Sequence, residues 1–353
     1  MSGATSADAV ESERGGDVQR AMDALANSPE VVGAIGELYV DGERVGRGSA
    51  GTRLLDGEGG HIPSSARYRV GSQTKQMTAT VLLQLVEEGR LGLDDTLADV
   101  LPVVAERDLV ERAEEITVRQ LIRHTSGIPD FFATRLPDSF DMTTRYRPVD
   151  LVKMSRRLPP TGNPGERFSY SNTNYFLLGM IIERETGNSL ATELMRRIFV
   201  PAGMSRSYLT SKPPEGIRGP HGHGYYPDPQ GRLHDMDRLN ASYGWAAGGV
   251  VSTARDVSAF QRAFAQNKLL PAEPQRVITD PPEGAPPPSG RLCGGTPQLR
   301  AVAGSAPGYN AVTFTTADGR SQFAVSATLR VHNADPAVQA ALNRAAEAVF
   351  CPK

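Results

Sequence analysis

The strand-like segments of this 353-residue chain lie at its two ends, and the pattern between them is mostly helical. Residues 31–45 alternate in strand fashion around Asp41-Gly42, a pair that favours a hairpin turn. Similar alternation returns near the C-terminus around Asp318-Gly319. The predicted strands cover residues 31–45, 67–70, 301–304, 311–316 and 322–329. This arrangement predicts one α/β domain assembled from both termini, with a helical insertion between them.

The domain boundaries follow from this pattern. We expect a disordered N-terminus over residues 1–17, because this segment is polar. The α/β domain is predicted to be discontinuous, over residues 18–85 and 290–353, and residues 86–270 to form a mainly helical domain. The proline-rich segment 271–289 is predicted to be an irregular linker.

Composition argues against several classes of partner. Lys and Arg number 38 and Asp and Glu 40, so the formal charge of −2 does not suggest nucleic acid or an acidic membrane. No apolar run approaches the roughly 18 residues of a membrane span, and no signal peptide is visible. We therefore expect a cytoplasmic protein as the sequence stands, or a secreted one if a signal was removed. No cofactor is expected, and the oligomeric state stays open.

The two cysteines, Cys293 and Cys351, are too few for a disulfide framework and form no Cys-x-x-Cys motif. If they are paired, the bridge would hold the C-terminal helix in place. If the protein is cytoplasmic, two buried thiols are the default. The sequence leaves both possibilities open.

The residues with the clearest chemistry are Ser72 and Lys75, together with Tyr170 and Asn172. Ser72 and Lys75 are three positions apart at the start of a predicted helix, so their side chains share one face and can meet. A hydroxyl needs a nearby base to act as a nucleophile, and a lysine amine can serve where burial favours its neutral form. A tyrosine hydroxyl can relay the proton, and an asparagine amide can orient a substrate. This set of residues is typical of an enzyme that forms an acyl-enzyme.

Four stretches extend this motif into a resemblance that covers nearly the whole chain. They are Tyr68-Arg-Val-Gly-Ser-Gln-Thr-Lys75, Ile116-Thr-Val-Arg-Gln-Leu-Ile-Arg-His-Thr-Ser-Gly-Ile-Pro129, Pro164-Gly-Glu-Arg-Phe-Ser-Tyr-Ser-Asn-Thr-Asn174 and Ala246-Ala-Gly-Gly-Val-Val-Ser-Thr253. In their order and spacing the chain resembles the class C β-lactamase and penicillin-binding-protein superfamily, and most of all the actinomycete DD-carboxypeptidases. The resemblance implies an α/β fold whose antiparallel sheet is flanked by helices, with an all-helical inserted domain.

The resemblance also implies a role for each site residue. Ser72 would be the nucleophile, Lys75 its proton acceptor and Tyr170 an acid/base partner. Asn172 would hold the substrate amide. The backbone N–H groups of Ser72 and Ser305 would form the oxyanion hole.

One motif departs from the superfamily pattern. The strand that lines the site normally carries His or Lys, then Thr or Ser, then Gly, whereas this chain has Val302-Ala303-Gly304. The glycine still allows close approach of a substrate, but the cation and the hydroxyl are gone. Because a carboxylate is costly to desolvate without such partners, we expect weak binding of D-alanyl-D-alanine termini and of β-lactam acids.

Two further groups of residues are candidates for a substrate pocket and for a metal site. Tyr243 and Trp245 precede a glycine pair and could wall the substrate pocket together with Ala303 and Gly304, although aromatic residues more often belong to the core. A second group, rich in histidine and aspartate, lies in a glycine- and proline-rich loop without metal-ligand spacing, so we expect no metal site. Its members are His221, His223, His234, Asp228 and Asp235.

Three functions fit the sequence. The first is an acyl-enzyme-forming serine acyltransferase or hydrolase on a neutral ester, amide or lactam, of which a biosynthetic transacylase with small-molecule donor and acceptor is the favoured form. The superfamily's natural-product transacylases motivate this choice. The second is a D-alanyl-D-alanine carboxypeptidase or a D-amino-acid amidase or esterase. The third is a non-catalytic binding protein of the same fold.

Overall fold

A computed structural model describes residues 17–134, 138–210, 216–282, 284–285, 292–295 and 298–351. Of the N-terminus that we expected to be disordered, residues 1–16 lie outside the described residues. Among the described residues, no helix is both long and apolar enough to cross a bilayer.

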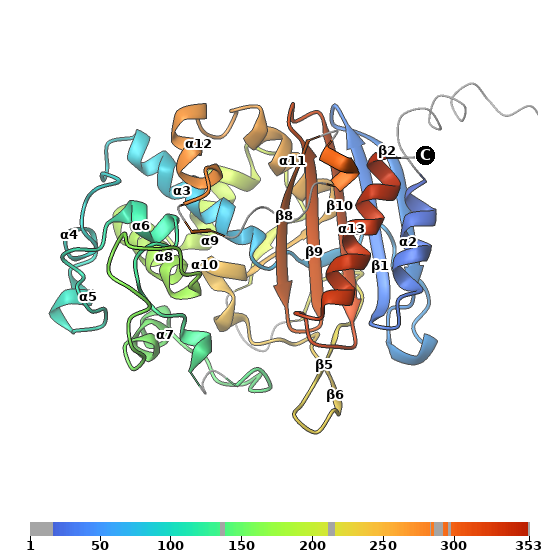
Figure 1. Cartoon of the computed structure of the whole chain (residues 1–353), viewed down its shortest axis with the longest axis horizontal. Coiled ribbons are helices and arrows are strands. Elements are labelled where there is room, and N and C mark those ends of the chain that lie inside the picture. The colour runs from blue at the N-terminus through green and yellow to red at the C-terminus, as the bar shows by residue number, and fades with distance from the viewer. Residues whose placement is uncertain are drawn as a thin grey trace, which may run out of the picture.

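A five-stranded sheet brings the two ends of the chain together (Figure 1). Its strands run in the order β2-β1-β10-β9-β8, and every neighbouring pair is antiparallel. Strand β8 therefore forms one edge. The bounds are Val31–Val40 for β1, Glu43–Gly51 for β2, Leu299–Ala306 for β8, Tyr309–Thr316 for β9 and Ser321–Leu329 for β10. The antiparallel α/β fold expected from the sequence is confirmed.

Helices cover both faces of this sheet, which explains why the central strands are buried along nearly their whole length. Helices α2 (Val18–Ala26) and α13 (Pro336–Phe350) pack together on one face, over a core that includes Leu38, Phe314 and Phe323. Helix α11 (Ala254–Ala265) packs on strands β1, β9 and β10. By its position in the sequence α11 falls in the predicted helical domain, residues 86–270, yet its apolar side covers the second face of the sheet.

The region from 86 to 270 is not entirely helical. Besides its helices it holds β4 (Tyr208–Leu209) and β7 (Val250–Thr253), which form a small sheet with β3 (Arg67–Arg69) from the α/β part. It also holds a hairpin of β5 (Tyr225–Pro227) and β6 (Leu233–Asp235). Its helices, besides α11, are α4 (Leu97–Val100), α5 (Val103–Glu106), α6 (Val118–Ile122), η2 (Phe131–Ala133), α7 (Pro148–Ser155), α8 (Asn172–Thr186), α9 (Leu190–Leu194), η3 (Met195–Phe199), η4 (Ala241–Tyr243) and α10 (Trp245–Gly248). One long helix, α3 (Gln73–Glu87), leads into this region from the α/β part.

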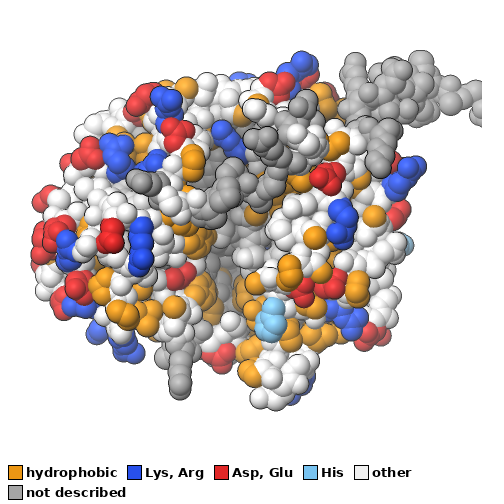
Figure 2. Space-filling model, in the orientation of Figure 1, with side chains coloured by type: hydrophobic (Ala, Val, Ile, Leu, Met, Phe, Trp, Pro, Cys, Tyr) orange, Lys and Arg blue, Asp and Glu red, His pale blue; other side chains and the backbone are white. Residues whose placement is uncertain are grey.

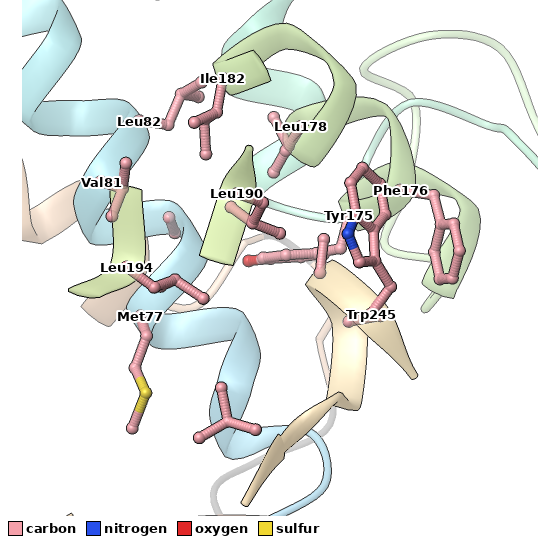
Figure 3. Packing of buried hydrophobic residues seen from close by; sticks show 14 of the residues in the cluster. Met77, Val81, Leu82, Tyr175, Phe176, Leu178, Ile182, Leu190, Leu194 and Trp245 are labelled. Carbon is pink, nitrogen blue, oxygen red and sulfur yellow. The ribbon is translucent and has the colours of Figure 1, made fainter. Parts of the chain in front are cut away.

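The core of the helical region holds α3 and α8 against each other. Met77, Val81 and Leu82 of α3 and Leu178 and Ile182 of α8 belong to one buried cluster (Figure 3). These residues are fully or almost fully buried. Because both helices begin at the functional site described below, this packing fixes the separation of the side chains at their N-termini.

The predicted linker contains a helix. Within residues 271–289 the structure has α12 (Ala272–Thr279), so the expectation of an irregular segment was wrong there. Pro274 lies in the first turn of this helix. Proline is tolerated there because the backbone N–H groups of the first turn have no partner within the helix, so no helical hydrogen bond is lost. Gln275 anchors the helix, since its Nε2 donates to the carbonyl oxygens of Phe264 and Leu270. Residues 283 and 286–289 lie outside the described residues.

Cys293 and Cys351 form a disulfide. The bond joins η5 (Leu292–Gly295) to the end of α13, and η5 precedes the edge strand β8. It therefore ties the segment that enters β8 to the last helix of the chain.

Candidate active site

The hydroxyl of Ser72 is presented by the first turn of α3. Ser72 is the N-cap residue, but its side chain makes no capping hydrogen bond. Its Oγ instead lies 2.9 Å from Oη of Tyr170 and 3.1 Å from Nζ of Lys75. The sequence placed serine and lysine on one face of a helix, and the structure brings the tyrosine from the residue pair just before α8 to the same point.

Lys75 is held by three oxygen atoms. Its Nζ lies 2.8 Å from Oδ1 of Asn172, 2.8 Å from the carbonyl oxygen of Ala247 and 3.1 Å from Oγ of Ser72. The amide and carbonyl oxygens are acceptors only. A neutral amine would therefore use its two N–H groups for these two oxygens and direct its lone pair at the hydroxyl of Ser72.

Burial changes the basicity of this amine. Lys75 is 6% exposed, and desolvation lowers the pKa of its amine to about 7, against an opposing effect from the negative charge of Asp130. A substantial fraction of the side chain is therefore neutral near pH 7. This is the protonation state that a general base requires.

Tyr170 remains a phenol at neutral pH. Desolvation of its hydroxyl, opposed by the hydrogen bond with Ser72, raises the pKa of Tyr170 to about 12. Its ring stacks on the imidazole of His124, with centroids 4.4 Å apart. Burial lowers the pKa of His124 to about 3, so the imidazole stays neutral, and its Nδ1 accepts a hydrogen bond from the backbone N–H of Ser171. His124 thus fixes both the ring of Tyr170 and the backbone next to it.

Asn172 is oriented by a residue that the sequence analysis missed. Its Nδ2 donates to Oδ2 of Asp130 at 2.7 Å, which leaves Oδ1 facing Lys75. Asp130 directly follows the matched stretch ending at Pro129, so its position next to a motif was the available signal. Because the carboxylate of Asp130 accepts a hydrogen bond from the amide nitrogen of Asn172, the amide oxygen of Asn172 faces the amine of Lys75.

On the opposite side, the backbone of β8 closely approaches the start of α3. A β-carbon on Gly304 would lie only 2.6 Å from the backbone nitrogen of Ser72, and one on Gly71 would lie 2.6 Å from the carbonyl oxygen of Ser305. Gly71 also has a positive φ of 55°. Glycine is therefore required at both positions. The backbone of Ser305 is thereby held beside that of Ser72, the pair of N–H groups expected to form an oxyanion hole.

A cavity of about 600 Å³ opens between these two walls. Figure 2 shows the molecular face hollowed between the helical region and the sheet, with hydrophobic side chains along the hollow. Ser72, Tyr170, Asn172, Ala303, Gly304, Ser305 and Tyr243 are among the residues that line it. The sequence analysis had named all seven.

Trp245 does not line this cavity, contrary to our expectation. It is 8% exposed and packs on Phe176 of α8, with ring centroids 5.4 Å apart (Figure 3). The residue begins α10, which turns the indole into the core between α3 and α8. Its burial supports the helices that carry the site.

The cavity does contain a cation that the sequence analysis did not consider. Among the described residues that line it, Arg69 is the positively charged one and none is acidic. Arg69 is 4% exposed, donates to the backbone carbonyl oxygen of Asp237 at 2.6 Å and lies over the ring of Tyr309 at 5.7 Å. One of its N–H groups is therefore already used by a backbone carbonyl oxygen.

Comparisons with known proteins show the family of this chain. The family model described as Beta-lactamase matches residues 18–348. Penicillin-binding protein 4 of Amycolatopsis lactamdurans is 32% identical over 258 residues, which are 72% of this chain and 64% of that protein. The chain thus spans about two thirds or less of the length of the first curated relatives it matches.

Two solved structures match along almost their whole length. A D-stereospecific amidohydrolase from Streptomyces sp. has a TM-score of 0.81 and 29% identity, covering 95% of this chain and 98% of its own. The D-amino acid amidase from Ochrobactrum anthropi SV3 complexed with L-phenylalanine has a TM-score of 0.80 and 25% identity, covering 94% and 97%. Together with the family match, these likenesses confirm the resemblance seen in the sequence. The chain belongs to the Beta-lactamase family, within the superfamily of serine β-lactamases and penicillin-binding proteins, whose members are typically serine hydrolases that work through an acyl-enzyme.

Proposed function

We propose that this protein is a serine amidohydrolase that forms an acyl-enzyme on Ser72 and cleaves neutral amides or esters of D-amino-acid type. The observation that carries the proposal is the contact of Ser72 with both Lys75 and Tyr170, at 3.1 and 2.9 Å. The amidohydrolase and amidase named above motivate the choice of D-configured amides.

Acylation uses the neutral form of Lys75. Its lone pair takes the proton of the Ser72 hydroxyl while Oγ bonds to the carbonyl carbon of the substrate. The carbonyl oxygen becomes an oxyanion, which accepts hydrogen bonds from the N–H groups of Ser72 and Ser305. The charge that develops on Lys75 is stabilised by the oxygens of Asn172 and Ala247, both at 2.8 Å.

Collapse of the tetrahedral intermediate requires a proton for the leaving amine. Tyr170 touches Oγ of Ser72 and retains its proton at neutral pH, so it can donate to the leaving nitrogen and regain a proton from Lys75. Water then attacks the ester by the reverse sequence, with its proton passing to the same relay. Both half-reactions leave Lys75 neutral, ready for the next cycle.

The substrate preference follows from the side chains on β8. Ala303 is exposed to the cavity at the position where the superfamily carries a hydroxyl. A carboxylate next to Ser72 would gain no hydrogen bond from this side chain, and one N–H group of Arg69 is already used by the carbonyl oxygen of Asp237. Since a hydrogen bond to a charged group contributes about 1.5–3 kcal/mol, we expect neutral amides to be favoured by about 10- to 150-fold.

The experiment compares kcat/KM for D-phenylalanine amide, for its L-enantiomer and for a peptide ending in D-Ala-D-Ala. We expect the D-amide to be the best of the three. Faster release of D-alanine from the peptide would overturn the assignment in favour of a carboxypeptidase. Intact-mass measurement with a reactive ester adds a separate readout, since a chain that acquires no adduct on Ser72 under any acyl donor is a binding protein.

A transacylase remains the second candidate, because the cavity is large enough to admit an acceptor beside the acyl group and its lining includes no acidic side chain among the described residues. In this case an amine or alcohol, instead of water, attacks the acyl-enzyme. Adding a primary amine to the ester assay measures how the acyl-enzyme partitions between transfer to the amine and hydrolysis by water. Amide product in excess of acid, at millimolar amine, would assign transfer as the principal reaction.

The compartment is part of the same proposal. Disulfides persist in oxidising compartments and are rare in the cytosol, so the Cys293–Cys351 bond favours a secreted protein over a cytoplasmic one. Isolation of the native protein from culture medium, with its cysteines resistant to alkylation before reduction, is the expected result.

A further inference from the structure

Two histidines and a carboxylate meet at the base of the β5–β6 hairpin, and none of the three lines the serine cavity. The sequence grouped five histidine and aspartate residues, but the structure divides them. His234 and Asp228 pair within the hairpin, with Nε2 and Oδ2 2.8 Å apart. His221 and His223, in contrast, gather with Asp237, which the sequence analysis did not include, and their ligand atoms lie within 4.8 Å of one another.

The three side chains form a compact and largely buried group. The imidazole rings of His221 and His223 are nearly parallel, at 6°, with centroids 5.2 Å apart. Nε2 of His221 lies 2.9 Å from Oδ1 of Asp237. Their side chains are 12%, 18% and 19% exposed for His221, His223 and Asp237. The residues come from the segments that precede β5 and follow β6, so a ligand among them would join both ends of the hairpin.

Outer hydrogen bonds fix which ring nitrogens face inward. Nδ1 of His221 is 2.5 Å from the carbonyl oxygen of Gly219, and Nδ1 of His223 is 2.7 Å from Oδ2 of Asp235. Both oxygens are acceptors, so each Nδ1 carries a hydrogen, and in a neutral ring Nε2 then presents a lone pair. Histidines that bind metals are held in this way, by a carbonyl or carboxylate on the second nitrogen.

The inward nitrogen of His221 supplies a second, independent observation. Nε2 is buried and makes no hydrogen bond of acceptable geometry with a described residue. Nε2 and Oδ1 of Asp237 lie 2.9 Å apart, which is an ion pair when the ring is protonated. Two acceptors at this distance repel unless a proton or a metal ion lies between them.

We propose that His221, His223 and Asp237 bind a zinc ion that ties together the two ends of the β5–β6 hairpin. Two imidazole nitrogens and one carboxylate oxygen match the ligands that Zn²⁺ prefers, whereas Ca²⁺ and Mg²⁺ prefer oxygen alone. Zinc holds such ligands at about 2.0–2.2 Å, so the ligand atoms of a tetrahedral site lie about 3.3–3.6 Å apart. The three ligand atoms, which lie within 4.8 Å of one another, must therefore move together by up to about 1.5 Å through side-chain rotation. Water would complete the coordination.

This site would act on the serine cavity only indirectly. Tyr226 of β5 lines the cavity, and Gly224, two residues before it, closely approaches Gly308 at the turn between β8 and β9. A metal at the base of the hairpin would therefore hold one wall of the cavity in place. The proposal does not depend on the identity of the substrate.

The test uses the full-length protein without a histidine tag, stripped with EDTA and passed into chelator-free buffer. Isothermal titration with ZnCl₂ is expected to give one site per chain. At 100 times the dissociation constant, zinc should raise the thermal midpoint by about 3–6 °C, whereas CaCl₂ and MgCl₂ should not. Co²⁺ should bind at the same site and give the visible absorption of a four- or five-coordinate complex.

Variants then locate the site. His221→Ala and His223→Ala should each abolish zinc binding. His234→Ala is the control, because His234 pairs with a carboxylate on the same hairpin but lies outside the proposed site, so this variant should leave zinc binding unchanged. Asp237→Asn retains the size of the side chain and is expected to weaken zinc binding at least tenfold, which gives a readout if an alanine variant fails to fold. An absence of stoichiometric zinc binding by the wild type, or equal loss in His234→Ala, would overturn the proposal and leave His221 and Asp237 as a simple ion pair.

Discussion

The helical wall of the cavity acts through side chains, whereas the strand wall acts mainly through backbone. At the N-termini of α3 and α8, Ser72, Lys75 and Asn172 form one connected set of hydrogen bonds. Across the cavity, β8 presents Ala303 and the backbone of Gly304 and Ser305. The side chains expected to carry the chemistry thus lie on one wall, while β8 on the other wall lacks the His or Lys and the hydroxyl that the superfamily motif carries. Bond cleavage is therefore expected to depend on the helical wall and substrate choice on the strand wall.

Loss of the nucleophile should have the largest effect. Ser72→Ala removes the atom that forms the acyl-enzyme, so kcat/KM for an amide is expected to fall by about 10⁵-fold. Ser305→Ala is the matched control on the strand wall. Because Ser305 is proposed to act through its backbone N–H, this variant should remain within a few-fold of the wild type. A large loss in Ser305→Ala would show that the strand wall also acts through its side chains.

The disulfide provides the next test, since it anchors the segment before the strand wall. The bond closes a loop of 58 residues, for which the chain-entropy relation gives about 4 kcal/mol of stabilisation. The double variant Cys293→Ser, Cys351→Ser should lose about this much free energy of unfolding in a urea titration. Wild type with reductant should behave in the same way. Two thiols that react with an alkylating agent in the unreduced, unfolded wild type would contradict the prediction.

The pH dependence of acylation tests the helical wall. Burial lowers the pKa of Lys75 to about 7, and only the neutral amine can accept the proton of Ser72. Acylation should therefore rise with pH and level off above 7, with a rate at pH 5 about 100-fold below the plateau. Burst kinetics with a chromogenic ester measure this directly. Tyr170→Phe should lower the rate but retain the inflection near 7, and a profile that is flat from pH 5 to 8 would exclude Lys75 as the base.

Restoring a hydroxyl to the strand wall should have the smallest effect. Ala303→Thr fits a strand and adds the missing donor, so kcat/KM for a D-Ala-D-Ala peptide should rise by about tenfold relative to that for a neutral amide. Ala301→Thr is the control, because Ala301 is also exposed on β8 but is absent from the described cavity lining. Equal changes in both variants would mean that the effect is not specific to the site.

The sequence by itself determined the features that depend on local spacing or on a matched motif. Three residues along a helix bring Ser72 and Lys75 together, and alternation at both ends of the chain specified the strands that form the antiparallel sheet. The motif Tyr170-Ser-Asn172 led to the two further side chains that reach Ser72 and Lys75.

Only the tertiary structure decided contacts between distant segments. It turned Trp245 into the core instead of the cavity, placed Asp130 behind Asn172, joined Cys293 to Cys351 and brought His221 to Asp237. Helical and strand periodicity reports which side of an element is apolar but not which partner covers that side. That choice depends on the packing of the whole chain, in which each contact must fit beside all the others.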